Sequence, residues 1–333
     1  MDCKRPHKHR ALTQLACVIS CFLLTASCSW VKDDTDDCPY GFWLNLHYTY
    51  NMLDVEAAQR YITDVSVYVY DDNGNYMTRI DATQEQLCAN SHRVRVEGLP
   101  EGDYQFVVWS GSGNSQYALA GERKGIDAFR LALAGTTASS SVQLPDLYHG
   151  FLPVVHYDDA YAAHDVYMTK DTNQLTCLMV PTNADSTLNP DDYTMRIVTA
   201  NGEMDAFNRL VSEVNYTYEP FHADTISIDD SDYGHLHGLQ FDISTLRLMA
   251  DTDCRLILEK KATADVVFDI SLPQYIGMIG SLHTLSGRQL SLQEYLDRQD
   301  FYSVVCFLSE GIDQLLQIQV NSWHLRADNH LKL

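Results

Sequence analysis

Positive charge is scarce in this chain of 333 residues. Lys and Arg total 23 against 45 Asp and Glu, which gives a formal net charge of -22. Proteins that bind nucleic acid need a basic surface to neutralise phosphates, and anionic membranes attract clusters of basic residues. The charge balance therefore argues against nucleic acid as a partner and against electrostatic docking on a membrane.

Long apolar runs are missing after the N-terminal segment. The apolar stretch from Ala11 to Leu24 is shorter than the roughly 20 residues that span a bilayer, and it follows a basic stretch that contains Lys4 and Arg10. A basic region followed by a short apolar region is typical of a secretory signal peptide. We therefore predict a signal peptide over residues 1–27 and no membrane-spanning helix.

The signal peptide ends in Leu23-Leu24-Thr25-Ala26-Ser27-Cys28, which resembles a bacterial lipoprotein cleavage site. At such a site the cysteine thiol receives a diacylglycerol and becomes the new N-terminus. Several acyl chains on one residue anchor a protein stably, whereas one chain binds marginally. We therefore predict lipidation at Cys28; an ordinary secretory signal with a chance cysteine is the alternative.

The next segment, residues 28–40, is predicted to be an acidic tether. It contains Lys32, Asp33 and Asp34, which resemble the surface-export signal of lipoproteins in one gram-negative phylum. The alternative is a solvated spacer that holds the folded part away from the bilayer. Both readings place the folded part outside the cytoplasm.

Recognisable catalytic motifs are also missing. The chain has no GxSxG, no HExxH, no Walker A loop and no CxxC pair. The segment from Asp229 to His237 offers aspartate oxygens for calcium and two histidines for a transition metal. Its spacing does not match an EF-hand, so we favour a solvated acidic loop. We predict no catalytic residues, no metal and no cofactor.

The cysteines do not form a dense disulfide framework. Five of the nine remain after Cys28, an odd number that leaves at least one free thiol. Cys177, Cys254 and Cys306 lie in apolar strand-like runs and are predicted to be buried thiols. Cys38 and Cys88 lie in polar segments and form the candidate disulfide pair.

Alternation with period two dominates the chain after residue 41. The run Asp64–Tyr70 leads through Asn73-Gly74 into Asn75–Ile80, and an Asn-Gly step between two such runs is typical of a β-hairpin. The same order recurs from Tyr193 to Asp205 around Asn201-Gly202. We interpret the recurrence as two copies of one β-sandwich plan, with chance recurrence as the alternative.

Few helices are expected. The pattern Ser291-Leu292-Gln293-Glu294 is that of a capping box and predicts a short helix over Ser291–Arg298, and Val55–Ile62 could form two turns. A closing hairpin is predicted from Tyr302 to Leu325. A polar stretch near residues 156–164 divides the chain into predicted domains at 41–158 and 159–333.

Several ordered segments resemble FimB-type fimbrial anchor lipoproteins of type V fimbriae. The similarity covers nearly the whole mature chain. The segments that carry it are Asp36–Pro39, Leu46–Met52, Val65–Gly74, Tyr104–Gly111, Asp146–Gly150, Lys170–Asn173, Gln293–Asp297 and Val320–Trp323.

This resemblance implies an all-β fold of two tandem transthyretin-like (Greek-key) sandwiches and a role as an anchor, tip or accessory subunit. It implies other fimbrial subunits as partners and places the lipidated Cys28 in the outer membrane, with the folded part at the cell surface. In such fibres an arginine-directed protease removes the first strand of a subunit. The vacated groove then accepts a strand from a neighbour by β-strand addition.

The chain has no arginine between Cys28 and Arg60. The expected first strand, Phe42–Tyr50, therefore has no cleavage site between it and the lipid. We expect this subunit to keep its first strand and so to terminate the fibre. The alternatives are a tip adhesin, a glycan-binding surface lipoprotein that uses exposed aromatic residues such as Trp30 or Trp43, and a lipid-anchored hydrolase.

Overall fold

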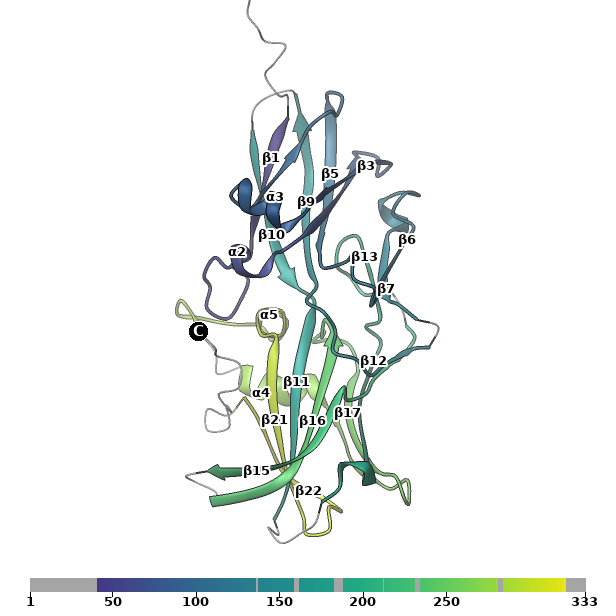
Figure 1. Ribbon diagram of the computed structural model, residues 1–333, viewed down its shortest axis with the longest axis vertical. Helices are drawn as coiled ribbons and strands as arrows, with labels where there is room; N and C mark the ends of the chain where they lie inside the picture. The colour runs from purple at the N-terminus through teal and green to yellow at the C-terminus, as the bar shows by residue number, and fades with distance from the viewer. Residues whose placement is uncertain are drawn as a thin grey trace, which may run out of the picture. The chain divides into compact units, whose positions relative to one another are not determined.

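The computed structural model describes residues 41–135, 137–158, 162–182, 188–211, 213–230, 234–280 and 284–321. Strands dominate this part of the chain (Figure 1), which confirms the all-β class. Cys28, the Lys32-Asp33-Asp34 segment and Cys38 lie outside the described residues. Lipidation, the export signal and the disulfide therefore stay predictions.

The first half of the chain builds a seven-stranded sheet. Its strand order is β3-β2-β5-β9-β10-β1-β4, and every neighbouring pair is antiparallel except β1 with β10. The strands are β1 (Phe42–His47), β2 (Val65–Asp71), β3 (Tyr76–Ala82), β4 (Arg93–Val96), β5 (Gly102–Ser110), β9 (Tyr148–Tyr157) and β10 (Ala163–Lys170).

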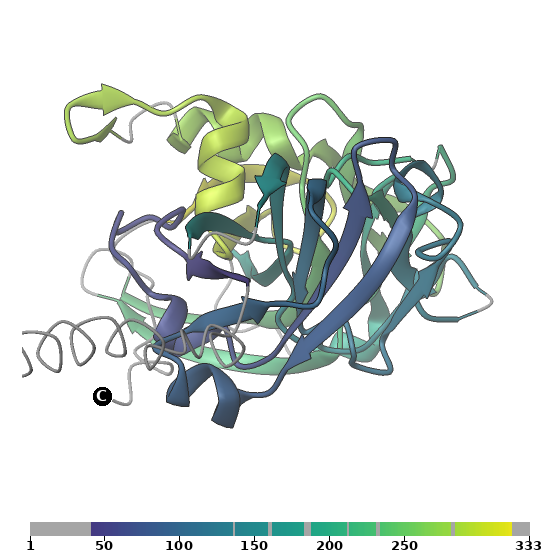
Figure 2. The ribbon, with the colours of Figure 1, turned by 90° about the horizontal axis from the view of Figure 1, so that it is seen from above.

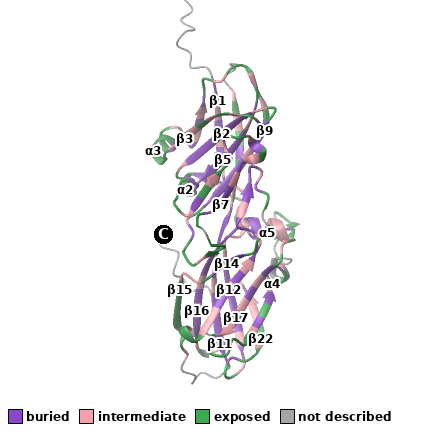
Figure 3. Cartoon of the chain, turned by 90° about the vertical axis from the view of Figure 1, so that its right-hand side faces the viewer, coloured by how far each residue is buried: buried purple, intermediate pink, exposed green. Residues whose placement is uncertain are grey.

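This sheet folds over its own core. Strands β5 and β1 are separated by two others in the sheet, yet the rings of Phe106 and Phe42 lie 5.4 Å apart in an edge-to-face contact. Seen from above in Figure 2, the purple and blue strands curve around a common interior. Alternating residues such as Leu44, Val67 and Val108 fill it and are fully buried. Figure 3 colours much of β2 and β5 as buried.

The first Asn-Gly step forms the predicted hairpin. Strands β2 and β3 pair in antiparallel register around it, and Gly74 adopts a φ of 79° that favours glycine. Asp71 accepts hydrogen bonds from the backbone N–H groups of Asn73 and Asn75. The hairpin therefore follows from local turn chemistry.

The hairpin expected at the second Asn-Gly step is wrong. Strand β12 (Tyr193–Thr199) pairs with β14 (Tyr216–Tyr218) and β17 (Cys254–Lys260), whereas β13 (Glu203–Asp205) pairs with β7 (Arg130–Leu133). The reason is that the Asn201 side chain is buried. It donates to the carbonyls of Leu246 and Arg247 and accepts from the Tyr218 hydroxyl, so it closes a tertiary contact instead of a tight turn.

The second half contains two five-stranded sheets around one large core. Their orders are β15-β16-β11-β21-β22 and β18-β17-β12-β14-β8, with β11 and β21 parallel. The strands of these two sheets that have not yet been given are β8 (Ser139–Ser140), β11 (Thr172–Pro181), β15 (His222–Asp230), β16 (Gly234–Leu246), β18 (Val266–Ser271), β21 (Phe301–Leu308) and β22 (Leu315–Val320). Cys177, Cys254 and Cys306 are buried in this core, as predicted.

A three-stranded sheet, β13-β7-β6, joins the two halves. Strand β6 (Tyr117–Ala120) precedes the 3-10 helix η3 (Ile126–Ala128), and next to it Phe129 stacks on Trp109 of β5 at 6.4 Å. Trp109, Tyr68 and Tyr70 therefore face the large core and not the interior of the first sheet. A short pair, β19 (Thr284–Leu285) and β20 (Arg288–Gln289), completes the strands.

The helices are short. They are α2 (Ala58–Tyr61), α3 (Gln84–Ala89), α4 (Leu272–Gly280), α5 (Leu292–Arg298) and the 3-10 helix η4 (Pro190–Asp192). The predicted helix near residue 291 is confirmed as α5, with the Ser291 hydroxyl accepting from the Glu294 N–H. The helix expected over Val55–Ile62 is shorter, at α2. None of the described helices is long and apolar enough to cross a membrane.

The predicted boundary between residues 158 and 159 stays a prediction. Strand pairing groups β10 with β9 and β1 of the first sheet, and only Asp171 separates β10 from β11. Pairing also crosses the boundary where β7 meets β13 and where β8 meets β14.

Replacing Trp109 by alanine should destabilise the protein by about 3–5 kcal/mol, because it removes a fully buried side chain and leaves a cavity. Val154→Ala is the control: Val154 is 51% exposed, so its loss should cost within about 0.5 kcal/mol. Urea denaturation monitored by circular dichroism measures both. Equal effects would contradict the placement of Trp109 in the core.

Candidate functional site

Strand β1 is paired along both edges. It lies parallel to β10, with Trp43 opposite Ala163 and His47 opposite Tyr167, and antiparallel to β4. Its alternate residues Phe42, Leu44 and Leu46 are at most 4% exposed and belong to the core of the first sheet. The groove between β10 and β4 is therefore filled by the chain's own first strand.

The end of β1 is fixed by a histidine between two carboxylates. His47 Nδ1 lies 2.7 Å from Glu56 and its Nε2 lies 3.2 Å from Asp165 of β10. Asn45 donates to the same Asp165 oxygen at 2.8 Å. Glu56 in turn accepts from the N–H groups of Tyr48 and Ala58, so it holds the turn that follows the strand.

These contacts set the protonation of His47. Partial burial lowers its pKa, but the hydrogen bonds and negative charges of Glu56 and Asp165 outweigh that effect and raise the pKa above 6.5. The Tyr167 ring stacks on the imidazole at 5.2 Å. A protonated His47 therefore bridges β1, β10 and the following turn.

The start of β1 carries Trp43. The guanidinium groups of Arg93 and Arg95 lie over its ring, at 4.6 and 5.3 Å from the centroid. Trp43 was one of the aromatic residues considered for stacking on sugars. In the structure its ring instead links β1 to the neighbouring strand β4.

Asp171, the one residue between β10 and β11, belongs to a buried cluster of charged and polar side chains. Asp171 is fully buried and accepts a hydrogen bond from Asn208 Nδ2 at 2.8 Å, and Arg247 Nε lies 4.0 Å away. Arg247 also donates to both oxygens of Asp297 in α5, at 2.7 and 2.8 Å. The cluster thus holds the chain passage against α5.

Burial dominates the electrostatics of this cluster. It raises the pKa of Asp171 to about 7, even though Arg247 and the Asn208 hydrogen bond act in the opposite direction. Burial disfavours the charged form of Arg247 too, but Asp297 and Asp171 raise its pKa overall. Removing one member would therefore leave an uncompensated buried charge.

Helix α5 also binds the loop that follows the first strand. Arg298 donates to the carbonyl of Asn51 at 3.0 Å and to Asp54 at 3.1 Å, and its guanidinium lies 4.3 Å from the centre of the Tyr50 ring. The loop after β1 and the second half of the chain are thus joined directly.

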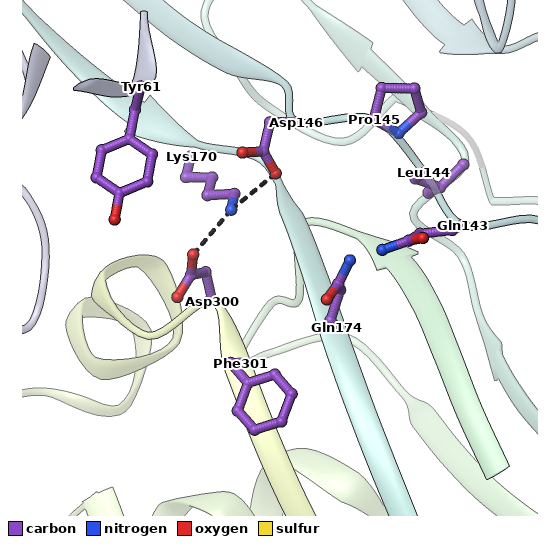
Figure 4. Close-up of a pocket in the computed structure, with 9 residues that line it drawn as sticks. All are labelled: Tyr61, Gln143, Leu144, Pro145, Asp146, Lys170, Gln174, Asp300 and Phe301. Carbon is purple, nitrogen blue, oxygen red and sulfur yellow. Dashed lines mark hydrogen bonds and ion pairs between the residues drawn. The ribbon is translucent and has the colours of Figure 1, made fainter. Parts of the chain in front are cut away.

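A pocket of about 610 Å³ opens beside this junction (Figure 4). Lys170, at the end of β10, lies between Asp146 and Asp300 and forms an ion pair with each at 2.8 Å. The Lys170 side chain is only 11% exposed. The ion pairs draw three distant segments of the chain together at the pocket wall.

The structure thereby gathers three of the segments that carry the family resemblance. Asp146, Lys170 and Asp297 belong to the Asp146–Gly150, Lys170–Asn173 and Gln293–Asp297 segments, and all three lie at this junction. Arg247 and Asn208 were not predicted. Neither residue lies in a recognisable motif. Each contacts residues that are distant in sequence, and a local pattern does not report such contacts.

The candidate metal-binding segment from Asp229 to His237 is described only in part. The rings of His235 and His237 lie 4.4 Å apart, and Ser227 hydrogen-bonds His237. Within the described ranges, no three His, Cys, Asp or Glu side chains gather closely enough to hold a metal ion. Cys88 is exposed in α3, and the disulfide with Cys38 stays a prediction.

Residues 35–329 match the family model described as fimbrillin-A associated anchor proteins Mfa1 and Mfa2. The chain belongs to this family. It is therefore a subunit associated with cell-surface fimbriae, in a family of structural anchor proteins that is not an enzyme family.

Relatives match most of the length of this chain. It is 23% identical to the minor fimbrium anchoring subunit Mfa2 of Porphyromonas gingivalis over 97% of this chain and 98% of the relative. The solved structure of the fimbrial anchor protein Mfa2 from that organism aligns with 86% of this chain and 98% of its own, at 17% identity and a TM-score of 0.64. The anchor proteins thus share this fold.

Two solved structures from Bacteroides thetaiotaomicron are also similar. A candidate adhesin aligns with a TM-score of 0.75 and 27% identity, covering 86% of this chain and 97% of its own. A candidate polysaccharide-binding protein aligns with a TM-score of 0.72 and 28% identity, covering 87% of this chain and 99% of its own.

Asp297→Ala should destabilise the protein by about 3–5 kcal/mol, because it leaves Arg247 and its neighbours with an unbalanced buried charge. Asp269→Ala is the control. It breaks the more exposed pair with Arg255 and should cost about 0–1 kcal/mol. Urea denaturation of both variants tests the prediction, and a cost for Asp297→Ala no larger than the control's would contradict it.

His47→Gln should remove a pH-dependent part of the stability. Since the pKa of His47 is higher in the folded protein than its usual 6.5, its contribution is fully present below pH 6.5 and is lost as pH rises through the folded pKa. The Tm difference between wild type and variant should therefore shrink from pH 5.5 to pH 9. A difference that does not change with pH would contradict the bridge.

Proposed function

We propose that this chain is a lipid-anchored fimbrial subunit that keeps its first strand and terminates the fibre at the membrane. The observation that carries the proposal is the position of β1, paired with β10 on one edge and β4 on the other. An incoming strand would have to displace β1, which buries Phe42, Leu44 and Leu46. The subunit therefore offers no vacant first-strand groove.

The sequence before β1 supports the same conclusion. Between Cys28 and Arg60 there is no arginine at which an arginine-directed protease could release the strand. Cleavage at Arg60 itself would remove β1 together with the lipid. A subunit of this kind donates to its neighbour by β-strand addition but accepts no further subunit.

Anchoring rests on the N-terminal segment. Acylated Cys28 would hold the protein in the outer membrane, and Lys32-Asp33-Asp34 would direct it to the cell surface. The Mfa2 relative, an anchoring subunit, supports this role. The partners would be the shaft or accessory subunits of the same fimbria, and the protein would have no catalytic activity.

The finer fold proposal is two tandem transthyretin-like sandwiches. Sheet membership favours a boundary at Lys170/Asp171 over the one at residue 158, because β10 pairs within the first sheet and β11 within the second half. The boundary would then coincide with the buried Asp171.

Adhesion is the second candidate function. The neighbours described as a candidate adhesin and a candidate polysaccharide-binding protein, both above 25% identity, favour a ligand-binding role. The polar pocket around Lys170 provides a place for a ligand on this chain. The two functions are compatible, because the pocket lies apart from the β1 groove residues Phe42, Leu44 and Leu46.

The N-terminus of the fibre-bound protein tests the proposal. We expect mass spectrometry to find a triacylated or diacylated peptide that begins at Cys28, with Phe42–His47 present in the same chain. Cys28→Ser should abolish palmitate labelling and release the protein and its fimbriae into the medium.

Two results would overturn this reading. A fibre-bound form that begins after Arg60 would show that β1 is removed. The second is that fimbriae stay attached to Cys28→Ser cells and that an antibody against this protein marks the fibre tip. That result would make the protein a tip subunit.

A further inference from the structure

We infer that the pocket around Lys170 binds a neutral oligosaccharide. This inference rests on the adhesion candidate and names its ligand class, and it does not depend on lipidation or on strand retention. The pocket measures about 610 Å³, which is within the roughly 300–1,000 Å³ typical of ligand sites. Its walls come from α2, the segment before β9, β10, β11 and the start of β21.

The charge of the pocket disfavours anionic ligands. Lys170 is its one cation among the lining residues, and its ammonium is already bound by Asp146 and Asp300 and lies over the Tyr148 ring at 5.9 Å. The two carboxylates outnumber the single ammonium. A phosphate or a uronic acid would meet net negative charge, whereas uncharged hydroxyl groups would not.

The ion pair with Lys170 also holds the Asp300 carboxylate in a position where it can accept a hydrogen bond from a ligand. Lys170 binds one oxygen of Asp300, and the second oxygen has no donor among the described residues. Because the ion pair already fixes the carboxylate, a ligand hydroxyl would bind it without the entropic cost of ordering the side chain. Vicinal hydroxyls of a sugar are well suited to such a fixed acceptor.

Two amides add groups that both donate and accept. The side chains of Gln143 and Gln174 line the pocket and hydrogen-bond no other described residue. Figure 4 shows both on the same side of the pocket, away from the Tyr61 ring. An amide matches a hydroxyl because each offers both a donor and an acceptor.

Aromatic rings complete the lining. Tyr61 of α2 and Phe301 at the start of β21 line the pocket from different elements. In Figure 4 the Tyr61 ring lies beside the Lys170–Asp300 pair, whereas the Phe301 ring points away from it. Tyr61 is 38% exposed. Its ring contacts Tyr48 edge-to-face and the Arg60 guanidinium, so only part of the ring is accessible to a ligand. The apolar face of a pyranose packs on such rings.

The test uses residues 28–333 with Cys28→Ser, so that the compact unit from Gly41 onward is kept whole. The probes are maltotetraose, cellotetraose, mannotetraose and chitotetraose, with tetragalacturonate and tetralysine for comparison. Saturation-transfer NMR and calorimetry measure binding. At least one neutral tetrasaccharide should bind, and neither comparison probe should.

Tyr61→Ala and Gln174→Ala should each weaken that binding about tenfold or more, with unchanged Tm. Tyr167→Ala removes an exposed tyrosine that does not line the pocket, so it should bind as wild type does. The inference is overturned if no neutral probe binds, if only tetragalacturonate or tetralysine binds, or if both pocket variants bind as tightly as wild type.

Discussion

The structure of the first half depends on the pairing of β1 with two strands at once. Without β1, the seven-stranded sheet would split between β10 and β4 and expose the core that Phe42, Leu44 and Leu46 cover. Exposed sheet edges readily accept strands from other chains. The occupied groove thus contributes to the stability of this half, and it is the basis of the proposal that the subunit accepts no neighbour.

The junction at Asp171 imposes the second constraint. One continuous segment runs from β10 into β11 through Asp171, which is fully buried. Together with the pairs β7–β13 and β8–β14, it connects the two halves. The contacts of α5 with Arg247 and with the loop after β1 restrict the same passage from the other side. The Lys170 pocket adjoins this segment, because Lys170 lines the pocket and directly precedes Asp171.

Much of this could be predicted from local sequence. The alternation of apolar and polar residues predicted strands, Asn73-Gly74 predicted the β2–β3 hairpin, and the capping pattern at Ser291 predicted α5. Each of these features is determined by residues that are close together in the chain. The Asn201 prediction failed because a buried side chain formed distant hydrogen bonds. The same limit applies to the junction: Arg247 and Asp297 are 50 residues apart, and no local pattern reports such a pair. The pairing of β1 with β10, which are more than 100 residues apart, was inaccessible for the same reason.

The parallel pairing of β1 and β10 has a mechanical consequence. Both strands begin at the same end of the sheet, and β10 leaves the opposite end to become β11. A pull on the chain preceding β1, resisted by the second half, therefore acts along the strands and loads their hydrogen bonds in shear, so that they must break together and not one after another. Tension on the tether would be carried into β11 through the whole length of this pair.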